Sequence, residues 1–510
     1  MGRVLPEVHR LSRRLAGLLV GAGLLAGCSV GPDYEAPDVT VPARWANGST
    51  AAPVAAPQLS AWWRRLNDPT LDALVREAVA GNLDVATAKA NVRNARATYR
   101  QAVGALFPQV VGDASAIHGD TGGGRDGPFG EANTYTRYNA GLAASWEIDL
   151  FGGNRRNMEA SIYGADAAED ELSAVLLALV GDVATYYVEA RGYQARTAFA
   201  RRTAASQRQT AAITRRMMEL GSASAMDVAN ATGLAASTEA GIPRLETAYA
   251  QSVHRVSVLT GRTPATLAPR LAKGGPIPAP RGRLPVGIPA NVLSNRPDVR
   301  AAERRYAQAT ARIGIAEAAR YPSVSLSGDL NTTGARPGDL ARGSSISWAF
   351  GPSLTVPIFN AGQLAAAVEV SEAQRDASFL AFQSSVLVAL EEVENALVAL
   401  AKEQERSAKL ASVTRSYGES LRLARELFEN GSTSFLEVLN GERSLYSAED
   451  SLLQSRVDIA TYYISLAKAL GGGWDRKVDV LTPVIVDRNT GPHLSPPMPQ
   501  PPPPAPGQPI

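Results

Sequence analysis

The residue types that usually perform catalysis or bind metal ions are sparse and scattered in this sequence. The four histidines are His9, His118, His254 and His493, and their spacing matches neither a zinc site nor a Ser-His-Asp triad. A glycine run at 122–124 lacks the lysine and the strand-to-helix setting of a phosphate-binding loop. We therefore expect a protein that is not an enzyme and that holds no metal.

The single cysteine, Cys28, stands at the end of an apparent secretory signal. A basic start and an apolar run from Leu15 to Leu25, too short to cross a bilayer as a helix, precede it. Leu25-Ala-Gly-Cys28 resembles the bacterial lipobox, which implies a signal peptide at 1–27 and a diacylglyceryl group on the cysteine sulfur. The alternative is a chance cysteine after an ordinary signal. Ser29 replaces the aspartate typical of lipoproteins retained at the inner membrane, which implies the outer membrane.

Composition and charge exclude several classes of function. The 510 residues are 45% hydrophobic, which is enough for a substantial folded core. The net charge is +2, and basic and acidic residues are interleaved without a basic stripe, so we expect no nucleic-acid partner. No run of 18 apolar residues follows the signal, so we expect no transmembrane helix, and strands are then the remaining way to span a membrane.

The chain contains an internal tandem duplication. Residues 84–110 match 298–324 at an offset of 214, and Gly221-Ser-Ala-Ser224 matches Gly431-Ser-Thr-Ser434 at an offset of 210. This pattern predicts a division into a signal peptide (1–27), an anchor and extended segment (28–67), a first repeat (68–262), a Pro/Gly-rich linker (263–284), a second repeat (285–473) and a Pro-rich tail (474–510).

Each repeat is expected to contain a helix, two strands and a long helical hairpin. In the first repeat we expect one helix from Asp68 to Leu106 and strands at 109–117 and 138–150. In the second we expect strands at 323–331 and 345–358. Apolar and polar residues alternate in the strands, which suits a barrel wall between lipid and water; the alternative is a half-buried soluble sheet.

Two very long helices are predicted at 157–220 and 362–430, each ending at a glycine, Gly221 or Gly431. At 1.5 Å per residue each would reach on the order of 100 Å, which suits an aqueous gap better than a compact globule. The return helices carry seven-residue apolar spacing, which predicts coiled-coil packing, and Pro243 should kink the first of them without ending it. These spacings are Ala235, Ile242, Tyr249 and Val256, and Leu445, Leu452, Ile459 and Leu466.

Four strands in one chain would leave two open edges that lipid cannot satisfy with hydrogen bonds. Several copies must therefore close the sheet, although the strand count does not give their number.

Five ordered motifs carry a resemblance to a known family. They are Cys28-Ser-Val-Gly-Pro-Asp-Tyr34, Trp62-Trp63 before Asp68-Pro69, Asp149-Leu-Phe-Gly152, Pro357-Ile-Phe-Asn-Ala-Gly362 and Ala469-Leu-Gly-Gly-Gly-Trp474. The chain resembles the TolC-like outer-membrane efflux family, in particular its NodT and OprM type of lipoprotein. The resemblance implies a mixed α and β membrane protein: a homotrimer with a shared 12-stranded transmembrane β-barrel, four strands per chain, and a long periplasmic α-helical barrel.

The resemblance also places a gate at the hairpin tips, whose turns should be at Gly221 and Gly431. After the second tip, Glu437 stands where the family carries one of two paired acids, and Asn440 takes the place of the other. Asp227 and Asn230 are the equivalents in the first repeat. Three copies of Glu437 around an axis would attract cations and repel one another; the alternative is a solvated helix face.

A tyrosine and an arginine that form a latch in the family have no counterpart, because Phe428 and Thr433 occupy those places.

By this interpretation the chain is the outer-membrane channel of a tripartite efflux system, a passive conduit for small molecules such as drugs or toxic compounds. Its implied partners are a periplasmic adaptor, an inner-membrane pump of the resistance-nodulation-division (RND) class and outer-membrane lipid. The lipid on Cys28 is the only cofactor expected. Two alternatives remain open: a duct for type I polypeptide secretion, and a lipid-anchored coiled-coil scaffold, which would not need the strands.

Overall fold

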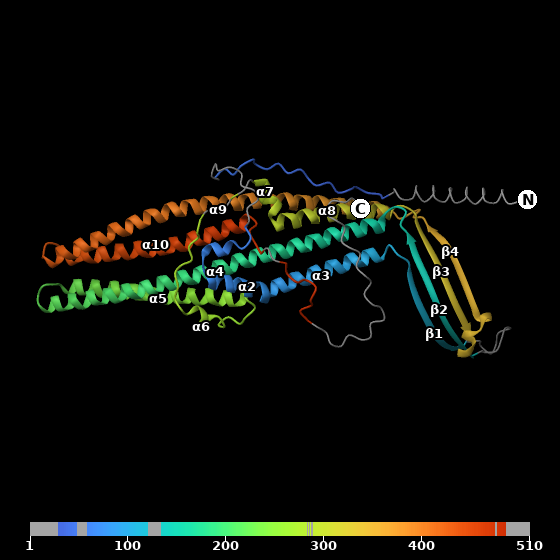
Figure 1. Cartoon of the computed structure of the whole chain (residues 1–510), viewed down its shortest axis with the longest axis horizontal. Coiled ribbons are helices and arrows are strands. Elements are labelled where there is room, and N and C mark those ends of the chain that lie inside the picture. Colours follow the sequence, from blue (N-terminus) through green and yellow to red (C-terminus); the bar gives the residue numbers. More distant parts are fainter. Residues whose placement is uncertain are drawn as a thin grey trace, which may run out of the picture.

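The computed structural model describes residues 29–47, 59–120, 134–282, 284, 286, 289–474 and 477–485. The signal peptide, Cys28, the glycine run at 122–124 and the tail from residue 486 lie outside these described residues, as do His9 and His493. Figure 1 shows a long helical body with a small β-sheet at one end and two helical hairpin tips at the other.

The order of elements repeats along the chain, which confirms the tandem duplication. A short 3-10 helix, η1 (Trp62–Leu66), precedes the first repeat. That repeat contains α2 (Pro69–Gly81), α3 (Leu83–Gly104), β1 (Gln109–Asp120), β2 (Thr134–Ile148), α4 (Gly153–Glu219) and α5 (Ala225–Leu259). A short helix, α6 (Ala268–Leu271), lies in the segment between the repeats. The second repeat contains α7 (Pro289–Asn295), α8 (Pro297–Ala318), β3 (Ser323–Gly334), η2 (Pro337–Ala341), η3 (Gly343–Ser345), β4 (Ile346–Thr355), α9 (Gln363–Glu429) and α10 (Phe435–Ala469).

The four strands form one antiparallel sheet in the order β1-β2-β3-β4. Leu142 pairs with Leu330, and Leu330 pairs with Trp348, so these apolar side chains share one face of the sheet. The predicted alternation is therefore present in the structure. The second strand ends at Ile148, earlier than predicted, because Asp149 turns to accept hydrogen bonds from the backbone of Asn154 and Arg155 at the start of α4.

One predicted helix is wrong: the segment from Asp68 to Leu106 is broken into α2 and α3 at Asn82. The Asn82 backbone is extended, and its side chain accepts hydrogen bonds from the backbone N–H groups of Asp84 and Val85, so it caps α3. Its amide also donates to the Leu259 carbonyl at the end of α5. In the second repeat Arg296 makes the equivalent contact with the Ala469 carbonyl at the end of α10.

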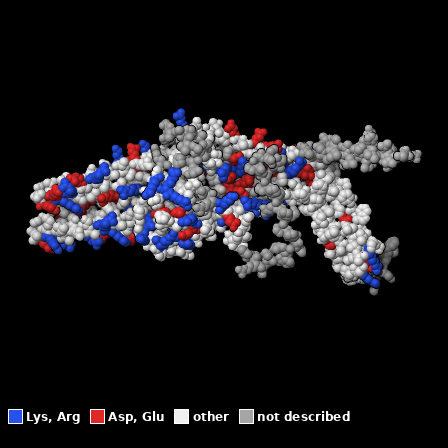
Figure 2. Space-filling model, in the orientation of Figure 1, with Lys and Arg blue, Asp and Glu red and all other residues white. Residues whose placement is uncertain are grey.

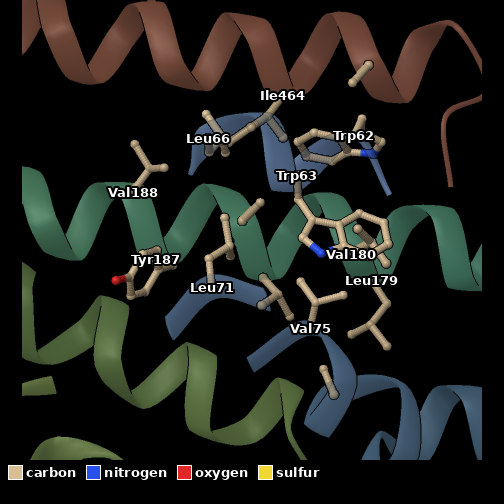
Figure 3. Packing of buried hydrophobic residues seen from close by; sticks show 14 of the residues in the cluster. Trp62, Trp63, Leu66, Leu71, Val75, Leu179, Val180, Tyr187, Val188 and Ile464 are labelled. Atoms are coloured by element: carbon tan, nitrogen blue, oxygen red, sulfur yellow. The ribbon is translucent and has the colours of Figure 1, made fainter. Parts of the chain in front are cut away.

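The main hydrophobic core lies midway along the helical body, where η1 and α2 pack against α4 and α10 (Figure 3). Trp62 is fully buried and donates to the Gly472 carbonyl, while Trp63 stacks on Trp474. Both contacts join the start of the described helical body to the residues that follow α10. These tryptophans therefore have a structural role in closing the core.

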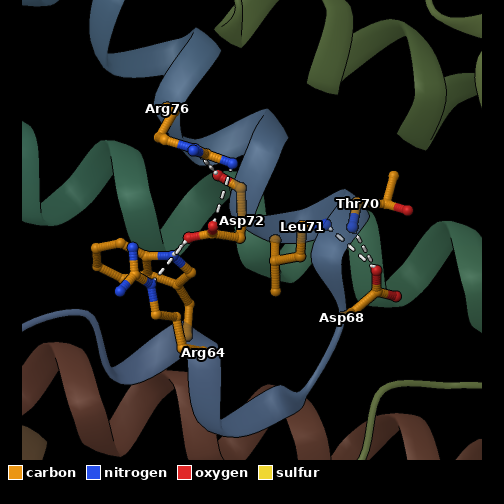
Figure 4. Close-up of polar contacts among 7 residues, drawn as sticks. Arg64, Asp68, Thr70, Leu71, Asp72 and Arg76 are labelled. Carbon is orange, nitrogen blue, oxygen red and sulfur yellow. Dashed lines mark hydrogen bonds and ion pairs between the residues drawn. The ribbon is translucent and has the colours of Figure 1, made fainter.

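Polar contacts fix the start of α2 against this core (Figure 4). Asp68 caps the helix by accepting from the backbone N–H groups of Thr70 and Leu71, and it also accepts from the Tyr187 hydroxyl. Burial and this hydrogen bond to Asp68 raise the pKa of Tyr187 to about 12, so the hydroxyl stays a donor at neutral pH. On the opposite side Asp72 binds Arg64 and Arg76.

Helices α4 and α9 each contain 67 residues and are the longest described elements, about 100 Å at the usual helical rise. Helix α5 continues through Pro243, so the proline does not end the helix, and the kink expected there stays a prediction. Of the four predicted apolar positions in α10, Leu466 is buried, whereas Leu445, Leu452 and Ile459 are half-buried. Ala448 and Ser455 beside them are buried. The row of α10 residues that packs within one chain is thus rotated slightly around the helix from the row predicted by the seven-residue spacing.

The sequence predicted no helix apolar enough to cross a membrane, and α4 departs from that expectation. Among the described helices it alone contains an 18-residue window whose length and composition would allow it to cross a membrane, and 50% of that window is buried inside the structure. The helix contacts α2, α3, α5, α8 and α10. Its apolar character is accounted for by this packing at the centre of the helical body.

Candidate functional site at the hairpin tips

Both hairpins turn at the end of the molecule farthest from the sheet (Figure 1). Gly221 and Gly431 lie in the two turns with φ of +79° and +72°, a region that favours glycine. In each turn the glycine N–H and the following serine N–H bond back to carbonyls of the last helical turn, which is the Schellman arrangement. The two tips therefore share the same backbone geometry.

Asp227 at the first tip is used to cap its own helix. Its carboxylate accepts from the Ser224 hydroxyl at 2.7 Å and from the Ser224 N–H at 3.0 Å, while Ser224 Oγ accepts from the Asp227 N–H. This is a reciprocal capping box at the start of α5. The hydrogen bonds from Ser224 lower the pKa of Asp227 below its ordinary value. Asn230, one turn further on, is exposed.

Glu437 occupies the same position in the second tip but makes no such contact. Ser434 is the N-cap of α10 without a side-chain capping bond. Glu437 is exposed, and within the described part of the chain its carboxylate has no hydrogen bond or ion pair. Asn440 is exposed as well. The structure thus leaves the Glu437 carboxylate free at the tip, and its role as a gate stays a prediction.

A small apolar cluster holds the second tip together. Phe435 at the start of α10 is buried and its ring lies 5.2 Å from that of Phe428 on α9. Leu421, Val438 and Leu439 belong to the same cluster, and Ala231 of α5 joins it from the first hairpin. Phe428 therefore packs against this cluster.

Polar links between the two hairpins were not predicted from the sequence. Near the tips the buried Glu442 carboxylate accepts from Arg425 at 2.8 Å and from Thr210 at 3.1 Å, so it joins α10 to α9 and α4. Further from the tips Arg196 binds Asp450 through two hydrogen bonds of 2.8 and 2.9 Å. The sequence offered one signal for the role of Glu442: it is an acidic residue on the face of a predicted helix that should be buried. Nothing in the sequence identified its partners, which lie on other helices.

The polar face of the sheet carries a network across three strands. Asn139 donates to Asp113 at 3.2 Å and accepts from Thr333 at 3.0 Å. Gly141 leaves the space beside it that the Asn331 amide fills, because a Cβ there would lie 1.9 Å from Asn331 Oδ1. Figure 2 shows charged side chains spread over the helical body, whereas the visible sheet is nearly free of them except at its far end.

The motifs noted in the sequence occupy the joints between elements. Gly152 and Gly362 are the N-caps of α4 and α9, and both have positive φ. Asn360 accepts from the Gly362 N–H, and Asp149 caps α4 in the first repeat. Val30 and Gly31 of the first motif lie beside the start of α4, where Arg156 donates to their carbonyls. Sequence reasoning did not single out Arg156, which has no arginine counterpart in the second repeat.

The described residues contain no group of three or more histidine, cysteine, aspartate or glutamate side chains arranged to hold a metal ion. His118 bonds to Thr136 on the neighbouring strand, and His254 is exposed on α5.

The chain is similar to known proteins over most of its length. A family model described as outer membrane efflux protein matches residues 74–262 and 288–472. Nodulation protein T of Rhizobium leguminosarum bv. trifolii is 36% identical over 453 residues, which cover 89% of this chain and 96% of that protein. The antibiotic efflux pump outer membrane protein ArpC of Pseudomonas putida is 32% identical over 470 residues, 91% of this chain and 96% of that protein.

A solved structure of the outer-membrane channel OprN is 34% identical and superposes with a TM-score of 0.81, covering 88% of this chain and 100% of that one. The fold is thus that of the TolC-like outer-membrane channels, as the motifs implied. Together with the duplicated helix–strand–strand–hairpin unit, these matches show that the chain belongs to the outer membrane efflux protein family and is an outer-membrane channel component of an efflux system.

Proposed function

We propose that this protein is a passive homotrimeric conduit that is anchored by a lipid on Cys28 and carries small molecules out of the cell. Three copies of the four-stranded sheet close one 12-stranded barrel in the outer membrane (3 × 4 strands), and the hairpins form a periplasmic tunnel. The observation that carries this proposal is the sheet itself, which is apolar on one face and open at both edges.

The sheet has the properties of a barrel segment. Within the described chain, β1 and β4 each pair with one strand only, so each presents an unpaired edge. Trp348 is 75% exposed, and Leu142 and Leu330 are exposed beside it on the same face. A neighbouring copy would satisfy the edges, and lipid would cover the apolar face.

The long helix α9 also presents apolar side chains that this chain does not cover. Leu380 and Leu387, two turns apart, are 62% and 67% exposed, and Val370 is exposed on the same helix. An apolar spacing of seven residues suits packing against a helix of a second copy. Oligomerisation therefore has support from both the sheet and the helices.

The chain supplies the shape of the conduit and no catalysis, so energy must come from partners. We infer a periplasmic adaptor and an inner-membrane pump of the RND class. One relative is named as part of an antibiotic efflux pump and others as part of toluene efflux pumps, which favours small organic molecules over polypeptides as the cargo. A scaffold that only tethers other proteins would have no use for the lipid-facing sheet.

Single-channel conductance in planar bilayers tests this proposal, together with the oligomeric mass in detergent. Wild type is compared with Glu437→Gln, and Asp227→Asn is the matched control because that acid is engaged in a capping box. We expect a trimer that conducts, with a cation preference that falls in Glu437→Gln and changes little in Asp227→Asn.

The outcomes separate the parts of the proposal. A conducting trimer whose cation preference is unchanged by Glu437→Gln would support the conduit and refute the acidic gate. A monomer without conductance would refute the conduit and favour the scaffold.

A further inference from the structure

The first described residues are fixed at the junction between the sheet and the helical body. Ser29 lies against Gly152, the residue just before α4, where a Cβ would come within 2.6 Å of Ser29 Oγ. The Val30 N–H donates to the Phe151 carbonyl at 3.1 Å. The chain that directly follows residue 28 therefore has a defined place next to the last residues of the β2–α4 connection.

A buried guanidinium holds this segment. The Arg156 side chain is only 5% exposed, and it donates to the Val30 carbonyl through Nε and to the Gly31 carbonyl through Nη2, both at 3.1 Å. It also binds the carboxylates of Asp33 and Glu159 at 2.7 Å. A buried charge is retained only when its donors are satisfied, and the planar fork of arginine suits successive carbonyls better than a lysine ammonium does.

Two glycines allow the segment to approach this closely. Gly31 has a φ of +86°, and a Cβ on it would lie 2.4 Å from Gly314 Cα in α8. A Cβ on Gly314 would in turn lie 2.7 Å from Arg156 Cγ. We call Gly31, Arg156 and Gly314 the N-terminal seat. It has no room for an added side chain, so the path of the segment is closely specified.

Aromatic residues also lie at this junction between the sheet and the helical body. Each of the four connections between a helix and a strand contains one aromatic residue. They are Phe107 (α3–β1), Phe151 (β2–α4), Tyr321 (α8–β3) and Phe359 (β4–α9). Phe107 and Phe359 are 57% and 89% exposed, and the rings of Phe151 and Tyr321 stack at 4.6 Å. Aromatic rings gather where the apolar band of a membrane protein meets water.

We propose that the N-terminal seat positions the lipid of Cys28, so that its acyl chains enter the periplasmic leaflet of the outer membrane beside the Phe151–Tyr321 pair. Arg156 is then a positioning residue for the anchor. One peptide link, less than about 4 Å between Cα atoms, separates residue 28 from Ser29. This inference rests on the proposed lipidation and on the membrane location of the sheet.

The test measures how close the N-terminal segment lies to lipid. The lipidated full chain has no free thiol once Cys28 is acylated, so Pro32→Cys, an exposed position, can carry one fluorophore. The labelled trimer is reconstituted into phospholipid vesicles that contain lipids spin-labelled near the headgroup. We expect quenching of the fluorophore in the otherwise wild-type chain and a loss of quenching in Arg156→Lys.

Two further variants keep the test decisive. Gly314→Ala lies on another helix and should displace the same guanidinium, so quenching should fall there too. Arg155→Lys is the control, because Arg155 binds Asp149 and should not change the quenching. Trimer mass and conductance check that each variant is assembled.

Equal quenching in Arg156→Lys and the parent chain, or no quenching in the parent, would overturn the seat while the conduit still conducts. A wild-type mass without acyl groups would overturn the lipidation and the seat together.

Discussion

The two hairpin tips are copies of one element, yet different forces hold them. Both turn at a positive-φ glycine and both return through a helix of 35 residues. The first tip is fastened by the Ser224–Asp227 capping box, while Ala225 and Met226 beside it are exposed. The second tip places Phe435 where the first has Ala225, and this ring is buried against Phe428.

This difference separates the acids at the two tips. Asp227 is engaged with its own helix end, so its charge serves local structure. Once Phe435 anchors the second tip, Glu437 is not needed for capping and its carboxylate stays free. Of the two duplicated acids, only the one at the tip without an apolar anchor is engaged in a capping box.

The largest expected effect comes from removing that apolar contact. Phe435→Ala should lower the local stability of the second tip by about 3–5 kcal/mol, since it deletes a buried aromatic ring from a packed cluster. Met226→Ala in the first tip is the control; that side chain is 69% exposed, so the change should stay within about 0.5 kcal/mol. Hydrogen exchange of amides in the first turns of α5 and α10 measures both.

Equal exchange rates in Phe435→Ala and the wild type would show that the cluster does not hold the second tip.

A smaller loss is expected at the first tip when its cap is removed. Ser224→Ala should cost about 0.5–2 kcal/mol in the opening of α5, whereas Ser434→Ala, which removes no side-chain cap, should cost much less in α10. The same exchange measurement compares the two serines. Equal costs would mean that the capping box does not distinguish the tips.

The first tip should also be the acid-sensitive one. Because the hydrogen bonds of Ser224 lower the folded-state pKa of Asp227 below its unfolded value, the stabilisation is complete at neutral pH. This stabilisation is lost as the pH falls below the ordinary carboxyl pKa of about 4 and through the lower folded-state pKa. Amide exchange at the start of α5 should therefore show this acid-induced opening in the wild type and not in Asp227→Asn.

Much of the fold could be predicted because its signals are periodic. Strand alternation, uninterrupted helical stretches and the glycines that end them all lie within short windows of sequence, and they located β1–β4, α4 and α9 to within a few residues. The break at Asn82 was missed because a capping asparagine inside an apolar helical pattern does not interrupt that pattern. The sequence Asn82-Leu-Asp84 does contain a capping signal.

The contacts that depend on distant partners could not be predicted. Arg156 binds carbonyls about 125 positions earlier in the chain, and Glu442 accepts from Thr210 on another hairpin. No local pattern marks such pairs. Asp227 and Glu437 looked alike from their spacing, and only their side-chain contacts distinguish them.

The smallest effect is expected when the second tip is given the acid of the first. Ser434 and Ser224 have nearly the same backbone angles, with φ and ψ of −77° and 153° against −90° and 157°. Glu437→Asp should therefore form the reciprocal capping box and stabilise the start of α10 by about 0.5 kcal/mol. Because the carboxylate would then be engaged, the cation preference of the channel should fall although the charge is retained. If amide exchange shows a new cap while the cation preference stays at the wild-type value, then the charge of residue 437 sets the preference whether or not its carboxylate is hydrogen-bonded. If neither changes, the matching backbone angles are not sufficient to form the cap.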